Sequence, residues 1–193
     1  MRNLVFFLEE PSAREMLKGL LPRIIPSNDV SFQYIVFEGK QDLEKRLPKK
    51  LKGWCKPESS FIVLCDQDST DCQEVKKKLR VVCQKNGHPE SLIRIACREL
   101  ESWYLGDLKA VENALELNGL ARKQERAKYR TPDNLNNAAQ ELDVLTKQVY
   151  QKVSGSRQIG PYLDLENNRS HSFGVFVNGI MRFFSRKNTR EVT

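Results

Sequence analysis

Four short apolar runs, separated by helical segments, most constrain what this chain can fold into. The runs cover residues 4–8, 30–37, 61–65 and 92–96, and the first is apolar throughout, as in a strand buried on both faces. Apolar residues three and four apart mark the helices between them. Because strands alternating with helices of this length need right-handed crossovers, the pattern predicts an α/β fold with a mainly parallel sheet of about four strands.

The second half of the chain has a different pattern. Beyond residue 97 no further strand is predicted, and apolar residues recur at helical spacing. We expect a single α/β domain with a core over residues 1–105 and a helical C-terminal extension over 106–193 that packs on it. The segment SGSRQIGP, residues 154–161, is rich in glycine and serine and is predicted to be a loop. The last helix is predicted over 173–184.

The N-terminus and the cysteines favour a cytoplasmic protein. The first apolar run has only five residues before two glutamates, which is too short for a membrane span or a signal peptide. The five cysteines are odd in number and form no CxxC pair, so reduced thiols are the simplest interpretation. We expect no association with a membrane.

The charge of the chain favours a polyanionic partner. It has 32 basic and 25 acidic residues, a net charge of +7, and basic runs at residues 45–52, 76–80, 122–130 and 182–190. Any single run is more often a solvated helix face, but together they favour nucleic acid, because phosphate contacts release counterions. The candidate contacts are Lys45, Lys49, Lys50, Arg122, Lys123, Arg126, Arg169 and His171.

Acidic residues follow three of the four predicted strands. Since the carboxyl ends of parallel strands share one edge, these side chains would converge and repel each other unless a cation neutralised them. Oxygen ligands with no suitable histidine or cysteine partner favour Mg²⁺ or Mn²⁺. The candidate ligands are Glu9, Glu10, Asp66, Asp68, Glu99 and Glu101.

Each acidic pair also has an ordinary structural explanation. Glu10 is as easily explained by the dipole of the helix that follows it, and Asp66 and Asp68 could form a turn. Glu99 and Glu101 could favour the first turn of a helix. The position of the Asp-x-Asp directly after a buried strand, together with Glu9 after another, gives the metal interpretation its weight.

Two stretches resemble the Toprim domain of topoisomerases, primases, recombination-repair proteins and overcoming-lysogenization-defect nucleases. FFLEEPSARE looks like its first motif and VLCDQDSTD like its second, over about residues 1–105. The resemblance implies a magnesium- or manganese-dependent endonuclease in which Glu9 is a general base or ligand and Asp66 and Asp68 are ligands. The glycine usual after the first motif's glutamate is Glu10 here, which removes the conformational freedom of glycine and adds a negative charge.

The whole chain, including RELESWYLGD and SHSF, resembles a bacterial Toprim-like family encoded beside ATPases of the ABC or AAA type. That resemblance implies an effector subunit of an anti-phage defence system with an ATPase partner. Whether the chain forms a homo-oligomer stays an open question. Two other functions stay open: a receiver-like phosphoacceptor, which would need a fifth strand ending in lysine, and a non-catalytic adaptor that binds nucleic acid or the ATPase.

Three further features have two interpretations each. Lys40, in EGKQD, could stabilise charge on a scissile phosphate, but an exposed turn is slightly favoured. Trp103 and Tyr104 could stack on bases, but core positions are favoured. The polar stretch 169–172 could bind an anion or cap the last helix, and capping is favoured.

Overall fold

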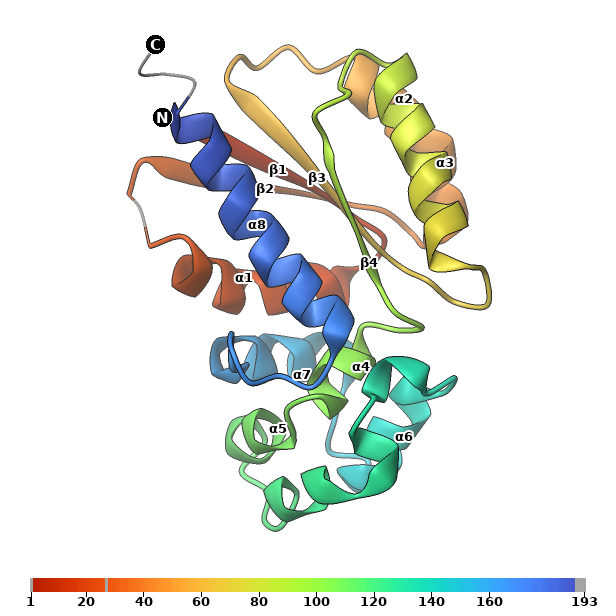
Figure 1. Ribbon diagram of the computed structural model, residues 1–193, viewed down its shortest axis with the longest axis vertical. Coiled ribbons are helices and arrows are strands. Elements are labelled where there is room, and N and C mark those ends of the chain that lie inside the picture. Colours follow the sequence, from red (N-terminus) through yellow and green to blue (C-terminus); the bar gives the residue numbers. More distant parts are fainter. Residues whose placement is uncertain (1, 27, 190–193) are drawn as a thin grey trace.

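The computed structural model describes residues 2–26 and 28–189 (Figure 1). Its sheet has the order β2-β1-β3-β4, and every neighbouring pair is parallel, which confirms the predicted α/β fold. The strands are β1 (Arg2–Leu8), β2 (Val30–Val36), β3 (Ser59–Asp66) and β4 (Leu92–Ala96). The two central strands, β1 and β3, are therefore the ones that end in the predicted metal ligands.

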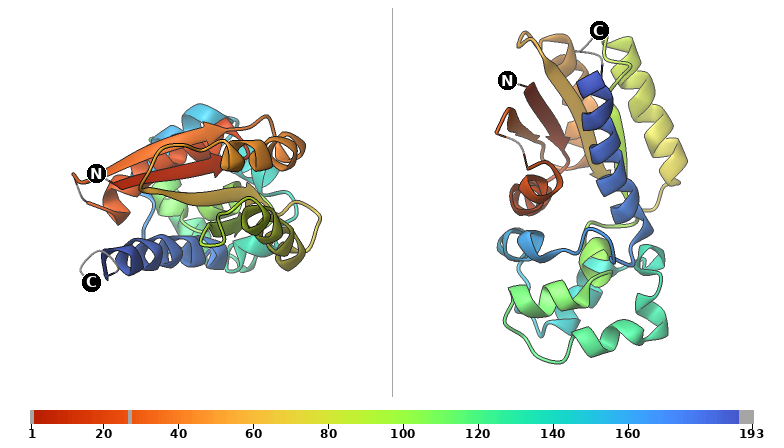
Figure 2. Two further views of the ribbon diagram at one scale, coloured as in Figure 1. Left: turned by 90° about the horizontal axis from the view of Figure 1, so that it is seen from above. Right: turned by 60° about the vertical axis from the view of Figure 1, so that its left-hand side comes forward.

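Helices cover both faces of the sheet (Figures 1 and 2). Helices α2 (Lys40–Lys52) and α3 (Cys72–Lys85) pack on one face, where alternate residues of β1 such as Val5 and Phe7 join their leucines. Helices α1 (Pro11–Ile24) and α8 (His171–Thr189) pack on the other face, against residues such as Phe6 and Leu64. The alternation of β1 side chains between two separate cores follows from the two-residue period of a strand.

A helical segment between β4 and α8 lies below the carboxyl ends of the strands (Figure 1). Its helices are α4 (Glu101–Leu105), α5 (Leu108–Ala114), α6 (Ala138–Leu145) and α7 (Lys152–Ile159), with 3₁₀ helices η1 (Ala121–Glu125), η2 (Ala127–Tyr129), η3 (Pro132–Asn134) and η4 (Gly160–Tyr162). Helix α7 packs on α1, and α8 then returns along β4. The expected helical part is thus present, and it covers the edge of the sheet where the acidic residues lie.

The predicted loop over residues 154–161 is wrong, because most of it forms α7. Its glycines allow close packing and do not make a turn. A Cβ on Gly155 would lie 2.5 Å from the ring of Tyr150, and one on Gly160 would lie 2.4 Å from the carbonyl oxygen of Met16. The predicted range of the last helix, 173–184, was too short, since α8 starts two residues earlier and ends five residues later.

Two broader predictions concern membranes and thiols. Within the described ranges, no helix is both long and apolar enough to cross a membrane. The five cysteines are all free, and Cys65 and Cys83 are buried in the sheet core as apolar side chains.

Candidate metal centre

Strand pairing brings the acidic residues after β1 and β3 together. Leu8 pairs with Leu64, so Glu9 lies beside the last residues of β3. The Oε2 atom of Glu9 accepts a hydrogen bond of 3.0 Å from the backbone N–H of Asp66. Burial raises the pKa of Glu9, although this hydrogen bond to its charged form opposes the shift.

The carboxyl group of Asp66 lies among other carboxylates. Burial raises its pKa well above the usual range, and the nearby charges of Glu10, Glu9 and Glu101 raise it further. Burial also raises the pKa of Glu101, which belongs to α4 in the helical segment. Four of the six predicted ligands therefore share one region, formed by the sheet edge on one side and the helical segment on the other.

A lysine that the sequence did not single out lies in the same region. The Nζ atom of Lys152, the first residue of α7, is 2.7 Å from the Oε2 atom of Glu10, whose other oxygen accepts a hydrogen bond from Ser12. The charge of Lys152 lowers the pKa of both Asp66 and Glu101, in opposition to burial. An acidic rim implies a positively charged neighbour, but nothing in the sequence distinguishes Lys152 from the chain's other basic residues.

Two buried polar atoms beside this cluster have no hydrogen-bond partner among the described residues: Glu101 Oε2 and Tyr104 Oη. The other oxygen of Glu101 accepts a hydrogen bond of 2.9 Å from Tyr150. Glu101 is 1% exposed, so water does not satisfy the free oxygen from outside. An unsatisfied buried polar group costs about 1–3 kcal/mol, more if charged. A carboxylate oxygen of this kind suits a hard cation, and the all-oxygen donor set fits Mg²⁺ or Mn²⁺.

Lys40, at the start of α2, holds the loop that follows β3. Its Nζ atom donates hydrogen bonds to the carbonyl oxygens of Asp66 and Gln67 at 3.2 and 3.0 Å, and lies 2.8 Å from Asp68 Oδ2. Although burial opposes it, the hydrogen bond to Asp68 raises the pKa of Lys40. Asp68 has a left-handed backbone with φ of 56°. Lys40 thus does more than occupy an exposed turn, because it positions the Asp-x-Asp loop and neutralises Asp68.

The two remaining predicted ligands have partners of their own. The Oε2 atom of Glu99 accepts a 2.8 Å hydrogen bond from the backbone N–H of Ala139 at the start of α6. Asp68 is paired with Lys40, and its charge also raises the pKa of Glu9, so Asp68 lies beside the cluster. In residues 2–26 and 28–189, no three acidic, histidine or cysteine side chains are arranged to hold a metal ion as they stand.

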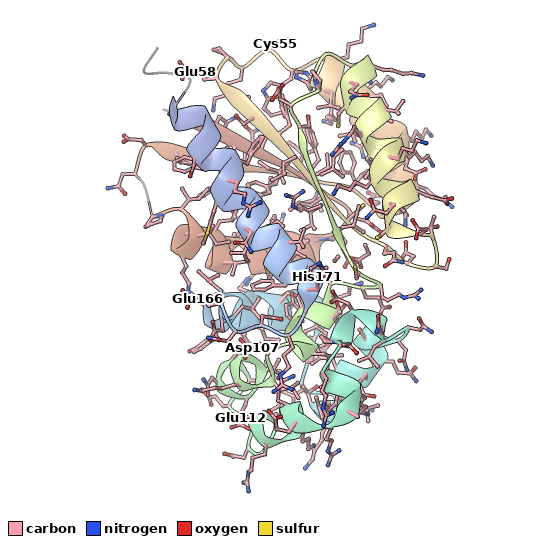
Figure 3. The ribbon with its side chains drawn as sticks, in the orientation of Figure 1. Cys55, Glu58, Asp107, Glu112, Glu166 and His171 are labelled. Carbon is pink, nitrogen blue, oxygen red and sulfur yellow. The ribbon has the colours of Figure 1, made fainter. Side chains whose placement is uncertain are left out.

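The predicted nucleic-acid contacts lie on separate surfaces. Lys45, Lys49 and Lys50 are exposed on α2, on one face of the sheet. The others lie on the helical segment or at its junction with α8, where Figure 3 shows His171 at the first turn. Arg169 forms an ion pair with Glu125 there. The structure does not bring these two groups together: Lys45, Lys49 and Lys50 are apart from Arg122, Lys123, Arg126, Arg169 and His171.

The core and capping interpretations are confirmed. Trp103 and Tyr104 are fully buried, so neither presents a ring to a base. Ser170 Oγ accepts a hydrogen bond from the N–H of Phe173 and so caps α8. The carboxylate of Asp133 accepts a 2.7 Å hydrogen bond from the N–H of Ser172, so this helix end already has an anion of the protein's own.

The parallel sheet, with acidic residues at the ends of β1 and β3 and a helical segment over its edge, defines a Toprim-like α/β fold. The chain belongs to the family described as Domain of unknown function (DUF4276), which matches residues 8–181. Its structure is similar to the C-terminal region of the Burkholderia pseudomallei OLD protein, with a TM-score of 0.53 and 16% sequence identity, covering 93% of this chain and 95% of that one. A comparison with curated proteins found no match.

Proposed function

We propose that this protein is a metal-dependent nuclease that hydrolyses phosphodiester bonds of DNA or RNA. The observation that carries the proposal is the burial of Asp66 among Glu9, Glu10 and Glu101, with one oxygen of Glu101 unsatisfied. Grouped carboxylates in a buried site are stable in their charged form only with a cation beside them. The fold similarity to the OLD C-terminal region is compatible with this function.

Glu9, Asp66 and Glu101 would hold the ion, and Asp68 and Glu10 become available if their lysine partners move to the substrate. A divalent ion in such a site polarises the phosphodiester and promotes attack by water. The chain itself supplies the rest. Lys40 and Lys152, beside the carboxylates, are positioned to stabilise the negative charge that develops on the phosphate. Acceptance of a proton is the alternative role of Glu9 if it does not hold the ion, and its raised pKa suits it to that role.

The decisive experiment measures cleavage of plasmid DNA and of tRNA with Mg²⁺ or Mn²⁺. Asp66→Asn and Glu9→Gln should each lower the rate by more than about a hundredfold, because loss of even an outer-shell metal partner costs about 10–100-fold. Glu44→Gln, which removes a partly exposed carboxylate of α2 that is paired with Lys78 of α3, is the matched control and should cleave normally. Wild-type rates in the Asp66 and Glu9 variants would rule out this site.

Two other functions predict different results. A receiver-like module would gain the mass of a phosphoryl group from acetyl phosphate; the described part of the chain has four strands and lacks the fifth that such a module needs. A silent adaptor would bind Mn²⁺ and nucleic acid without cleavage. Our proposal also includes an ATPase partner of the ABC or AAA type, supported by the sequence resemblance, so cleavage should also be measured with that partner present.

A further inference from the structure

The edge strand β4 lies between α3 and α8 (Figure 1), and residues of all three elements line one cavity. Two adjoining cavities of about 130 and 390 Å³ share Arg94 of β4 and Val175 of α8. The first extends to Cys97 and His171 at the carboxyl end of the strand, and the second extends along α8 toward the other end. We call these two neighbouring cavities together the groove.

Four basic side chains lie in or beside this groove, and the carboxylate of Asp133 lies at its carboxyl end, where it accepts a hydrogen bond from Ser172. The four basic residues are Lys76 and Arg80 of α3, Arg94 of β4 and Arg182 of α8. Burial lowers the pKa of Arg94, and the charges of Arg80 and Arg182 lower it further. In the part of the chain that the structure describes, none of the four is within salt-bridge distance of an acid. Such a group of like charges is stabilised by an anion from outside.

The guanidinium of Arg94 is held in the groove and does not extend into solvent. Its Nε atom donates a hydrogen bond of 3.1 Å to the carbonyl of Val175, and Nη1 donates one of 2.9 Å to the carbonyl of Ile93. Helix α8 has a glycine at the contact: a Cβ on Gly179 would lie 2.1 Å from Nη2 of Arg94. The absence of a side chain at this position leaves room for the charged group.

One end of the groove adjoins the loop that contains Asp66 and Asp68. Cys97 lines this end of the groove, and its two neighbours in the sequence, Ala96 and Arg98, are hydrogen-bonded to that loop. The carbonyl of Ala96 accepts a 2.9 Å hydrogen bond from Gln67, and that of Arg98 accepts a 3.0 Å hydrogen bond from Asp68. A polymer lying in the groove would therefore reach the carboxyl edge beside the candidate metal centre.

We propose that this groove binds a single strand of nucleic acid through its phosphates and leads it to the carboxyl edge of the sheet. Naming the strand as substrate rests on the nuclease function, but the binding itself does not. Arginine guanidinium groups bind phosphate in a bidentate manner, and Ile95 of β4 and Phe183 of α8, which line the two cavities, add apolar surface of the kind found in channels that track single strands. The larger cavity, of about 390 Å³, is in the size range of a pocket for one small ligand such as a nucleotide.

Binding is tested by fluorescence anisotropy with labelled oligothymidylate and oligouridylate in EDTA, where metal-dependent cleavage cannot occur. Arg94→Gln should weaken binding about tenfold. The double variant Arg80→Gln with Arg182→Gln should lower the slope of log affinity against log salt by roughly 1.4, because each phosphate contact in a single strand contributes about 0.7. Lys109→Gln, which removes an exposed charge on α5 far from the groove, is the control and should match the wild type.

A pair of glycine variants tests the groove without changing any charge. Gly179→Ala should displace the Arg94 guanidinium and weaken binding several-fold. Gly174→Ala, on the same helix, meets no atom within 4 Å and should leave affinity unchanged. Circular dichroism and unfolding in urea establish that both variants are folded, and alanine in place of glycine favours a helix in each case.

The outcomes separate this proposal from the nuclease proposal. Binding that depends on Arg94 and Gly179 supports the groove even if no cleavage is ever detected. Equal affinity of Arg94→Gln, Gly179→Ala and the wild type overturns it, whether or not the protein cleaves. Preference for duplex, or equally tight binding of an acidic peptide that depends on the same residues, also overturns the single-strand assignment.

Discussion

The buried carboxylates of Glu15 and Asp66 differ in whether basic groups balance their negative charge. Glu15, at the interface between α1 and α7, accepts hydrogen bonds from Lys18 and Arg14 at 2.9 Å and from Arg157 of α7 at 2.7 Å. The hydrogen bond with Lys18, together with those from the two arginines, lowers the pKa of Glu15 to about 2 despite burial. Helices α1 and α7 are thus joined by a carboxylate whose charge is fully matched.

Asp66 shows the reverse. Its pKa is raised by burial and by three acidic neighbours, with Lys152 as the opposing cation. The fold therefore satisfies a charge where the charge holds helices together and leaves charges unbalanced at the carboxyl edge of the sheet. Unbalanced charge lowers stability, and it persists in proteins where a ligand or a reaction needs it.

The largest expected difference between the two regions is in the response to metal. With Mg²⁺ or Mn²⁺ at about a hundred times its Kd, the wild type should gain about 2.7 kcal/mol in the free energy of unfolding. Asp66→Asn should gain almost none, whereas Glu15→Gln should gain as much as the wild type. Urea unfolding with and without metal measures this. A gain in Asp66→Asn equal to that of the wild type would place the ion elsewhere.

Removal of the Glu15 charge, which basic side chains balance, should destabilise the protein even when no metal is present. Glu15→Gln should lower the free energy of unfolding by about 1–2 kcal/mol, since hydrogen bonds to charged groups are worth about 1.5–3 kcal/mol and the exposed basic partners reduce that value. Arg157→Gln should cost less, because Lys18 and Arg14 remain. Chemical unfolding in EDTA provides the comparison, and an unchanged midpoint for Glu15→Gln would contradict the role of the ion pairs.

Removal of the unbalanced charge of Asp66 should change the free energy of unfolding in the opposite direction. In EDTA at pH 8, Asp66→Asn should raise the free energy of unfolding by about 0.5–2 kcal/mol, the range seen when unfavourable charges are optimised. Glu44→Gln again serves as the control for loss of a carboxylate. A less stable Asp66→Asn in EDTA would mean that the carboxylate is compensated in the free protein after all.

The smallest effects should appear in the pH dependence of stability without metal. Asp66, Glu9 and Glu101 have raised pKa values, so the folded state binds more protons than the unfolded one. Stability should therefore fall as the pH rises from about 4 through the raised values. Glu15 has a lowered pKa, so its contribution should be lost as the pH falls from 4.5 to about 2.

Two variants separate the contributions of Asp66 and Glu15 to the pH dependence of the free energy of unfolding. Asp66→Asn should reduce the dependence above pH 4, and Glu15→Gln should reduce the dependence below it. Midpoints of urea unfolding between pH 2 and 8 measure both. The same slope in the wild type and in Asp66→Asn would show that Asp66 is not the group that titrates.

The strands and their ends were predictable, and the helical segment was only partly so. Short apolar runs located all four strands, and parallel strands must end at one edge, which placed Glu9 beside Asp66. The choice between Glu99 and Glu101 was not predictable. Both lie in the first turn after β4, and only the packing of Ala139 and Tyr150 shows which carboxylate faces the cluster.

Lys152 was missed because the sequence around it resembles a loop. Glycine and serine usually interrupt helices, but here Gly155 and Gly160 allow α7 to approach Tyr150 and Met16. Close packing of this kind depends on partners more than a hundred residues away, such as Met16, which a local pattern does not contain. The pairing of Lys152 with Glu10 depends on that same packing.

The chain enters and leaves the helical segment at nearly the same place. The N–H of Cys97, just after β4, donates a 3.2 Å hydrogen bond to Ser172 Oγ in the first turn of α8. The helical segment is therefore inserted into the α/β fold through two adjacent ends. Glu101 and Lys152 belong to the helical segment, whereas Glu9 and Asp66 lie at the ends of strands of the sheet. A substitution in the helical segment can therefore change the charges at this site while every residue of the sheet stays the same.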